Sequence, residues 1–142
     1  MGTVPRNRKG SQQHDEDKLG FGDIFTDHML TIEYSATDGG WGTPKIGAVQ
    51  DLRLHPAAMV LHYSQQVFEG LKAFSGPKDS DILLFRPGMN IDRFNRSCQR
   101  LCIPPISPKI FMDQMAEFLR TDRDWIPRSP GTSLYIRPTI IA

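Results

Sequence analysis

The segment "GTSLYIRPTIIA" (residues 131–142) ends the chain and predicts a β-strand. It is rich in the β-branched and aromatic residues that strands favour. Because successive side chains of a strand alternate between two faces, Tyr135, Arg137 and Thr139 share one face. The other face carries Leu134, Ile136, Pro138 and Ile140. Arg137 is therefore either a solvated side chain or part of a pocket wall, where its guanidinium lies against an aromatic ring and binds an anion.

Upstream of this strand, strand-like and helix-like segments follow one another. Strands are expected at residues 28–36, 45–54, 71–74 and 81–85. The last two flank a loop of turn-forming residues and should pair as a hairpin. A helix is expected over residues 57–70, stopped by Gly70. A further amphipathic helix should bury Phe111, Met115, Phe118 and Leu119. This order predicts an α+β fold, with helices packed on a mostly antiparallel sheet.

The clearest helical pattern lies in "RPGMNIDRFNRSCQRLC" (residues 86–102), with Asn90 as the expected N-cap. Its apolar stripe consists of Ile91, Phe94, Cys98 and Leu101, and its basic row of Arg93, Arg96 and Arg100. If Asn90 caps the helix, Arg93 lies in the first turn, where a cation opposes the helix dipole. Arg93 is then either a functional residue or a solvated one. The basic row also leaves open an unrelated anion- or nucleic-acid-binding domain.

The composition is typical of one globular domain. The chain has 142 residues, 39% hydrophobic and 23% charged, with a formal net charge of +1, which argues against a nucleic-acid partner. No apolar run approaches the roughly 18 residues that span a bilayer, so no membrane partner is expected. Residues 1–20 should form a disordered N-terminal tail before an ordered domain at 21–142. Cys98 and Cys102 should be free thiols, and no metal site is expected.

Four stretches together resemble the branched-chain amino acid aminotransferases. They are "FGDIFTDHML" (21–30), "LHYSQQVFEGLKAF" (61–74), "LLFRPGMNIDRFNRSCQRLCIP" (83–104) and "GTSLYIRP" (131–138). Their order and approximate spacing are those of the family, and the match covers almost everything from Phe21 to Ala142. D-amino acid aminotransferases and aminodeoxychorismate lyases share the fold-type IV architecture, but "FTDHM" and "HYSQQVFEG" do not resemble their sequences.

The resemblance implies the small N-terminal domain of a two-domain, homodimeric enzyme. The whole enzyme would transfer the amino group of Leu, Ile or Val to 2-oxoglutarate through pyridoxal 5'-phosphate, with glutamate as the product. The cofactor would lie between the small and large domains. By similarity, Arg93 would reach the cofactor phosphate, and the substrate pocket would be lined by Phe21, Tyr63, Phe68, Tyr135 and Arg137. A cytoplasmic location is expected, with the mitochondrion left open.

In the family, the lysine that forms the Schiff base belongs to the large domain. The six lysines of this chain stand in no similar context. The resemblance therefore implies a fragment that contains no catalytic residue and is inactive alone. The alternative is a non-catalytic truncated form that acts as an interaction or dimerisation module.

Overall fold

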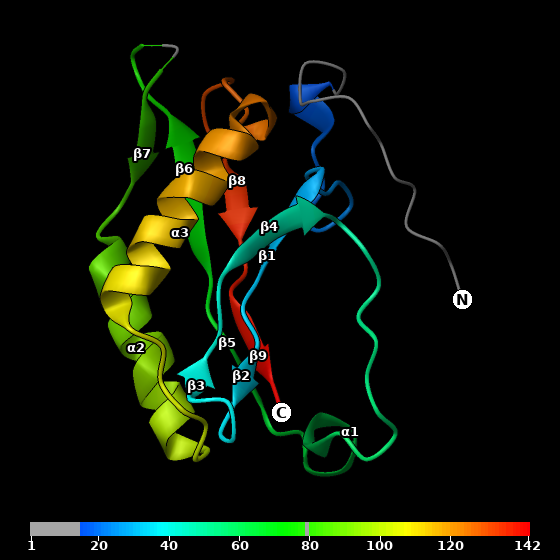
Figure 1. Ribbon diagram of the computed structural model, residues 1–142. Coiled ribbons are helices and arrows are strands. Elements are labelled where there is room, and N and C mark those ends of the chain that lie inside the picture. Colours follow the sequence, from blue (N-terminus) through cyan, green and yellow to red (C-terminus); the bar gives the residue numbers. More distant parts are fainter. Residues whose placement is uncertain (1–14, 79) are drawn as a thin grey trace.

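The computed structural model describes residues 15–78 and 80–142 and shows an α+β fold, as predicted (Figure 1). The strands are β1 (His28–Thr31), β2 (Tyr34–Ser35), β3 (Gly40–Trp41), β4 (Lys45–Ala48), β5 (Gln66–Phe68), β6 (Leu71–Ser75), β7 (Ile82–Leu84), β8 (Leu134–Ile136) and β9 (Thr139–Ile141). The helices are α1 (Met59–Tyr63), α2 (Pro87–Arg100) and α3 (Pro108–Thr121), with the 3-10 turns η2 (Glu16–Lys18) and η3 (Arg123–Trp125).

All strand pairs in the described residues are antiparallel, but they form several small sheets. The largest has the order β7-β6-β8, and the pairs β5-β9, β1-β4 and β2-β3 are separate. The predicted hairpin of residues 71–74 and 81–85 is confirmed, with Ala73 opposite Leu84. The strand expected at 28–36 is divided between β1 and β2, and the one expected at 45–54 ends at Ala48.

Helix α3 packs across the three-stranded sheet, as Figure 1 shows. A first core cluster joins them and contains Leu71, Ala73, Met115, Leu119 and Ile126. The predicted amphipathic pattern is confirmed for Met115 and Leu119, which are buried, whereas Phe111 and Phe118 are only partly buried. Apolar burial of this kind is the main stabilising term of such a layer.

Helix α2 packs beside α3 and against β5. A second cluster contains Val67, Ile91, Phe94, Cys98, Ile103 and Ile106. Three residues of the predicted stripe, Ile91, Phe94 and Cys98, are buried. The fourth, Leu101, was predicted wrongly: it follows the end of the helix and is 40% exposed. Phe111 touches both clusters and connects the two halves of the core.

The helix expected over residues 57–70 is wrong. Helix α1 is only five residues long and ends at Ser64, whose φ of 52° is left-handed. Gln66–Phe68 form strand β5 instead, paired with β9 more than 70 residues later in the chain. Tertiary pairing overrides the local helical pattern here, and Gly70 lies in the link between β5 and β6 rather than after a helix.

The expected N-cap of α2 is also wrong. The helix begins three residues earlier, at Pro87, whose fixed φ suits the first helical position. Arg86, with a φ of 48°, occupies the cap position. Arg93 is therefore in the second turn and does not oppose the helix dipole in the way its predicted position implied.

The final strand is interrupted at Arg137 and Pro138. Pro138 has no N–H to donate, and it separates β8 from β9. The register is nevertheless the same on both sides of this break: Phe68 faces Thr139, and Leu71 faces Ile136. The link between β5 and β6, Glu69 and Gly70, thus lies opposite the link between β8 and β9, Arg137 and Pro138.

Residues 1–14 of the expected tail lie outside the described part of the chain. Within 15–20, the Glu16 carboxylate accepts hydrogen bonds from the backbone N–H groups of Arg128 and Ser129, at 2.9 and 2.7 Å. The Ser129 contact is the main reason that the pKa of Glu16 is lowered. In the part of the chain that the structure describes, no helix has the length and apolar character needed to cross a membrane.

Candidate functional site

The guanidinium of Arg137 stands among three aromatic rings. Its Cζ atom lies 5.1 Å from the ring centroid of Tyr135, 5.5 Å from that of Phe68 and 5.8 Å from that of Phe21. Its Nη2 donates to the Tyr135 hydroxyl at 3.4 Å. Phe21 and Tyr135 meet edge to face, with centroids 5.0 Å apart. These distances are within the range of cation–π attraction, so the rings fix the cation without neutralising it.

Strand geometry explains why these side chains meet. Alternate residues of a strand point to the same face, and the register sets Lys72 opposite Tyr135 and Gly70 opposite Arg137. One face therefore carries Phe68, Gly70, Lys72, Tyr135 and Arg137. A Cβ atom at Gly70 would lie only 3.0 Å from Cζ of Tyr135. Gly70 is therefore required for the close approach of the tyrosine ring.

Two of the three aromatic side chains around Arg137 are unusually open for apolar groups. Phe21 is 72% exposed and Phe68 is 64% exposed. Exposed aromatic residues that gather around a cation indicate a contact or binding surface more often than an ordinary surface. The site therefore offers an apolar wall and one positive charge at the same place.

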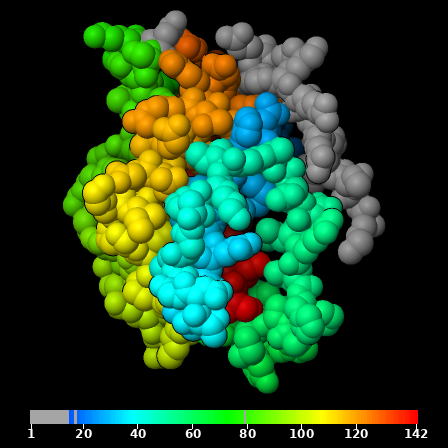
Figure 2. Space-filling model, viewed as in Figure 1, coloured from blue at the N-terminus to red at the C-terminus, as the bar shows by residue number. Residues whose placement is uncertain are grey.

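A cavity of about 840 Å³ opens beside this cluster, between the β1-β4 hairpin and the strands β8 and β9. Its lining includes Phe21, Lys72, Tyr135 and Arg137, together with Phe111, which packs against both core clusters. In Figure 2, residues of β9 are visible in a hollow between the β1–β3 region and the segment after β4. Thr139 and Ile140 of the same strand line the cavity. This volume is in the range typical of small-molecule sites.

Arg93 lies on the other face of the same strand link, paired with Glu69. Its Nε donates to Oε2 of Glu69 at 2.6 Å, and its Nη2 donates to Oε1. The carboxylate is buried, with 5% of the side chain exposed, whereas the arginine side chain is 61% exposed. The arrangement is a bidentate ion pair whose cation faces outward.

Further donors surround the Glu69 carboxylate. Its Oε1 accepts hydrogen bonds from the Gly70 backbone N–H at 2.8 Å and from the Asn90 side chain at 3.5 Å. Asn90 also donates to the Gly70 carbonyl at 3.1 Å. The Arg93 hydrogen bond, followed by those of Gly70 and Asn90, lowers the pKa of Glu69 against the opposing effect of burial. The same pairing raises the pKa of Arg93.

Sequence reasoning missed Glu69 and Gly70. Gly70 was interpreted as a helix stop, and Glu69 as part of that helix. The available signal was the β-prone run "QVF", which favours a strand over the helical pattern. Three consecutive residues make the contacts of the site. Phe68 contacts Arg137, Glu69 contacts Arg93, and Gly70 lies against Tyr135.

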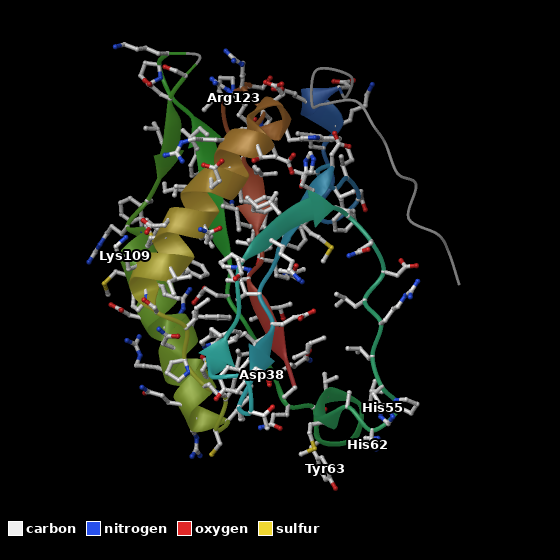
Figure 3. All side chains as sticks on the ribbon, in the orientation of Figure 1. Asp38, His55, His62, Tyr63, Lys109 and Arg123 are labelled. Atoms are coloured by element: carbon white, nitrogen blue, oxygen red, sulfur yellow. The ribbon has the colours of Figure 1, made fainter. Side chains whose placement is uncertain are left out.

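Tyr63 is the predicted pocket residue that the structure does not bring to this cluster. It ends α1, is 74% exposed and contacts the neighbouring His62 ring at 6.3 Å. Figure 3 shows it pointing away from the body of the molecule. Within residues 15–78 and 80–142, no group of three or more His, Cys, Asp or Glu side chains could hold a metal ion.

No protein-family model matches the chain. Its sequence is 51% identical over 128 residues to branched-chain-amino-acid aminotransferase 2 of Bacillus subtilis (strain 168), covering 90% of this chain and 35% of that protein. It is 48% identical over 121 residues to the mitochondrial branched-chain-amino-acid aminotransferase of Rattus norvegicus, covering 85% of this chain and 30% of that protein. The chain thus spans about a third of the length of these curated relatives.

The fold is similar to that of a solved branched-chain amino acid aminotransferase from T.th., crystallised with N-(5'-phosphopyridoxyl)-L-glutamate. The TM-score is 0.59, and the match covers 82% of this chain and 33% of that one. The two sequences are 22% identical over it, so this likeness concerns the fold. It confirms the predicted fold class.

Proposed function

The chain is a homologue of the branched-chain amino acid aminotransferases, and we propose that it is the small domain of such an enzyme. The whole enzyme would move the amino group of Leu, Ile or Val to 2-oxoglutarate. The observation that carries this proposal is the Arg137 cluster, which combines an apolar aromatic wall with a cation. A pocket for both an aliphatic side chain and a distal carboxylate needs these two properties together.

Arg93 suits the phosphate of pyridoxal 5'-phosphate. Its guanidinium is exposed, and Nη1 is the terminal nitrogen that Glu69 does not engage. A fixed guanidinium with an outward edge is the usual protein partner of a phosphate. When bound, this cofactor supplies an electron sink that stabilises negative charge at the α-carbon of the amino acid. The chain's own contribution is to orient the phosphate and the substrate side chain.

The substrate-side roles follow from the geometry around Arg137. Phe21, Phe68 and Tyr135 would contact the branched aliphatic side chain of Leu, Ile or Val. For glutamate or 2-oxoglutarate, the guanidinium would pair with the distal carboxylate. Tyr63 would enter the pocket only after a movement of α1, because here it points away from the body of the molecule and does not line the cavity.

The proposed partner of this domain is the large domain of the same enzyme, within a homodimer. Large apolar side chains such as Phe85, 80% exposed, and Leu61, 59% exposed, give the chain an apolar surface for such packing. The proposed compartment is cytoplasmic or mitochondrial, since relatives of both kinds are named.

The test compares cofactor affinities in the whole protein that carries this chain. Arg93→Ala should weaken binding of pyridoxal 5'-phosphate by about tenfold or more, because a charge-assisted contact to phosphate is lost. Binding of pyridoxal, which has no phosphate, should not change. Arg100→Ala, two turns later on α2, is the matched control and should alter neither affinity. A wild-type protein that neither prefers the phosphorylated compound nor transaminates leucine would refute the proposed function.

A further inference from the structure

Glu69 has a combination of properties that structural stability alone does not call for. Its carboxylate is 5% exposed, and burying a charge is costly unless it is fully paired. All of its partners belong to the candidate site: Arg93 and Asn90 on α2, and the backbone N–H of Gly70. A well-packed apolar residue in this place would avoid the desolvation cost.

The carboxylate determines how Arg93 presents itself. Because Nε and Nη2 are both bound to Glu69, the guanidinium plane is fixed, and the edge that carries Nη1 is directed away from the carboxylate. An arginine with 61% of its side chain exposed would otherwise sample many rotamers. Pre-ordering of this group removes most of the entropy cost from anion binding.

The backbone of the same residue is tied to the strand that holds Arg137. The Glu69 N–H donates to the Pro138 carbonyl at 2.9 Å. Nearby, the Thr139 hydroxyl donates to the Val67 carbonyl at 3.0 Å. In Figure 1 the link between β5 and β6 runs alongside the link between β8 and β9, with α2 packed near it. Glu69 thus contacts α2 with its side chain and the Arg137 strand with its main chain.

We propose that Glu69 is a positioning residue that orients Arg93 for the cofactor phosphate and holds the Phe68–Gly70 link against Arg137 and Tyr135. The proposal rests on the proposed function of the chain. Glu69 itself touches neither cofactor nor substrate. It acts on the cofactor side through the guanidinium and on the substrate side through Gly70, whose missing Cβ leaves room for Tyr135.

The first experiment measures phosphate selectivity, defined as the affinity for pyridoxal 5'-phosphate divided by that for pyridoxal, in the whole protein. Glu69→Gln should lower the selectivity about tenfold, since coupled residues typically interact on that scale. Arg93→Ala should abolish the selectivity, and the double variant should lose no more than Arg93→Ala alone. That non-additive result would identify Glu69 as acting through Arg93.

A second readout separates positioning from mere stabilisation. With the cofactor saturating, Glu69→Gln should raise KM for 2-oxoglutarate severalfold through Gly70, with kcat lowered by less than about threefold. Glu69→Asp should restore part of the phosphate selectivity, because it keeps the charge with a shorter reach. Asp113→Asn, which removes an exposed carboxylate paired with Lys109, is the matched control and should change none of these quantities.

If Glu69→Gln does not fold, Asn90→Ala is the variant to measure instead. It removes one hydrogen-bond donor to the Glu69 carboxylate but leaves the ion pair with Arg93 in place. It should lower phosphate selectivity about twofold to threefold. The proposal is overturned if Arg93→Ala loses the selectivity while Glu69→Gln and Asn90→Ala keep it. If Arg93→Ala also keeps it, the proposed cofactor role of Arg93 fails instead, and the two failures are distinguishable.

Discussion

The imidazole of His28 and the carboxylate of Asp122 are joined across 94 residues of sequence, with Nδ1 and Oδ1 2.5 Å apart. The His28 backbone N–H donates to the other oxygen of the same carboxylate at 3.2 Å. Close by, the Trp125 indole donates to Asp27 at 3.2 Å. These contacts fasten the start of β1 to the end of α3, which keeps the β1-β4 hairpin over the cavity.

Replacing Asp122 by Ala should therefore destabilise the chain. Asp122 is 3% exposed, so its removal leaves the His28 backbone N–H and imidazole without their buried acceptor. The expected loss in the free energy of unfolding is about 1–3 kcal/mol. Urea denaturation followed by circular dichroism measures it. Asp113→Ala, in an exposed pair on the same helix, provides the baseline, and equal midpoints for the two variants would contradict the expectation.

The Glu69 carboxylate should make stability depend on pH in one direction. Its pKa in the folded chain is below the ordinary value of 4.5, so the unfolded chain binds more protons in acid. The stabilisation is then complete above about pH 4.5 and is lost as the pH falls through the lowered value. Wild type and Glu69→Gln should differ by about 1–2 kcal/mol near pH 7. The difference should shrink in acid; a difference that grows there would refute the assignment.

The two thiols should react at very different rates. Cys98 is fully buried in the second core cluster, and burial raises its pKa, so little thiolate forms. Cys102 is exposed just beyond α2. Iodoacetamide at pH 8 should label Cys102 at least about tenfold faster than Cys98, as measured by peptide mass spectrometry. Equal labelling of the native chain would mean that this part of the core opens readily, and a urea-unfolded sample provides the reference for full reactivity.

Replacing Arg137 by Met in the whole enzyme should separate the two substrates. Methionine keeps an apolar contact to Phe21, Phe68 and Tyr135 but cannot pair with a carboxylate. The half-reaction with glutamate should therefore lose about two to three orders of magnitude in kcat/KM. The half-reaction with leucine should lose about tenfold or less. Single-turnover absorbance of the cofactor follows each half-reaction separately. Equal losses would reduce Arg137 to a structural residue of the strand.

Local patterns predicted the parts of the fold whose contacts are close in sequence. The β6-β7 hairpin depends on turn chemistry and was predicted correctly. The apolar side of α3 depends on helical periodicity, and two of its four predicted residues, Met115 and Leu119, are buried. Strand β5 was not, because its partner β9 lies more than 70 residues away and no local rule contains that pairing. The start of α2 was misplaced because the capping preference of Asn90 was given more weight than Pro87, which occupies the first helical position.

In the candidate site too, contacts between residues close in sequence were predicted and contacts between distant residues were not. The strand period predicted that Tyr135 and Arg137 share a face, and their contact confirms this. The Arg93–Glu69 pair could not be predicted, since it joins α2 to a strand link that the sequence pattern assigned to a helix. The binding roles stay predictions: cofactor phosphate for Arg93, and substrate for Phe21, Tyr63, Phe68, Tyr135 and Arg137.

The two opposite links, residues 69–70 and 137–138, also restrict where residues can be inserted or deleted. Glu69 and Gly70 on one strand face Arg137 and Pro138 on the other, and the pairing keeps its register beyond them. One residue inserted into a single link would turn every following side chain to the opposite face, so that Leu71 after the first link, or Ile140 after the second, would leave the core. Insertions and deletions in related proteins should therefore be absent from both links or occur in both together, in compensating numbers.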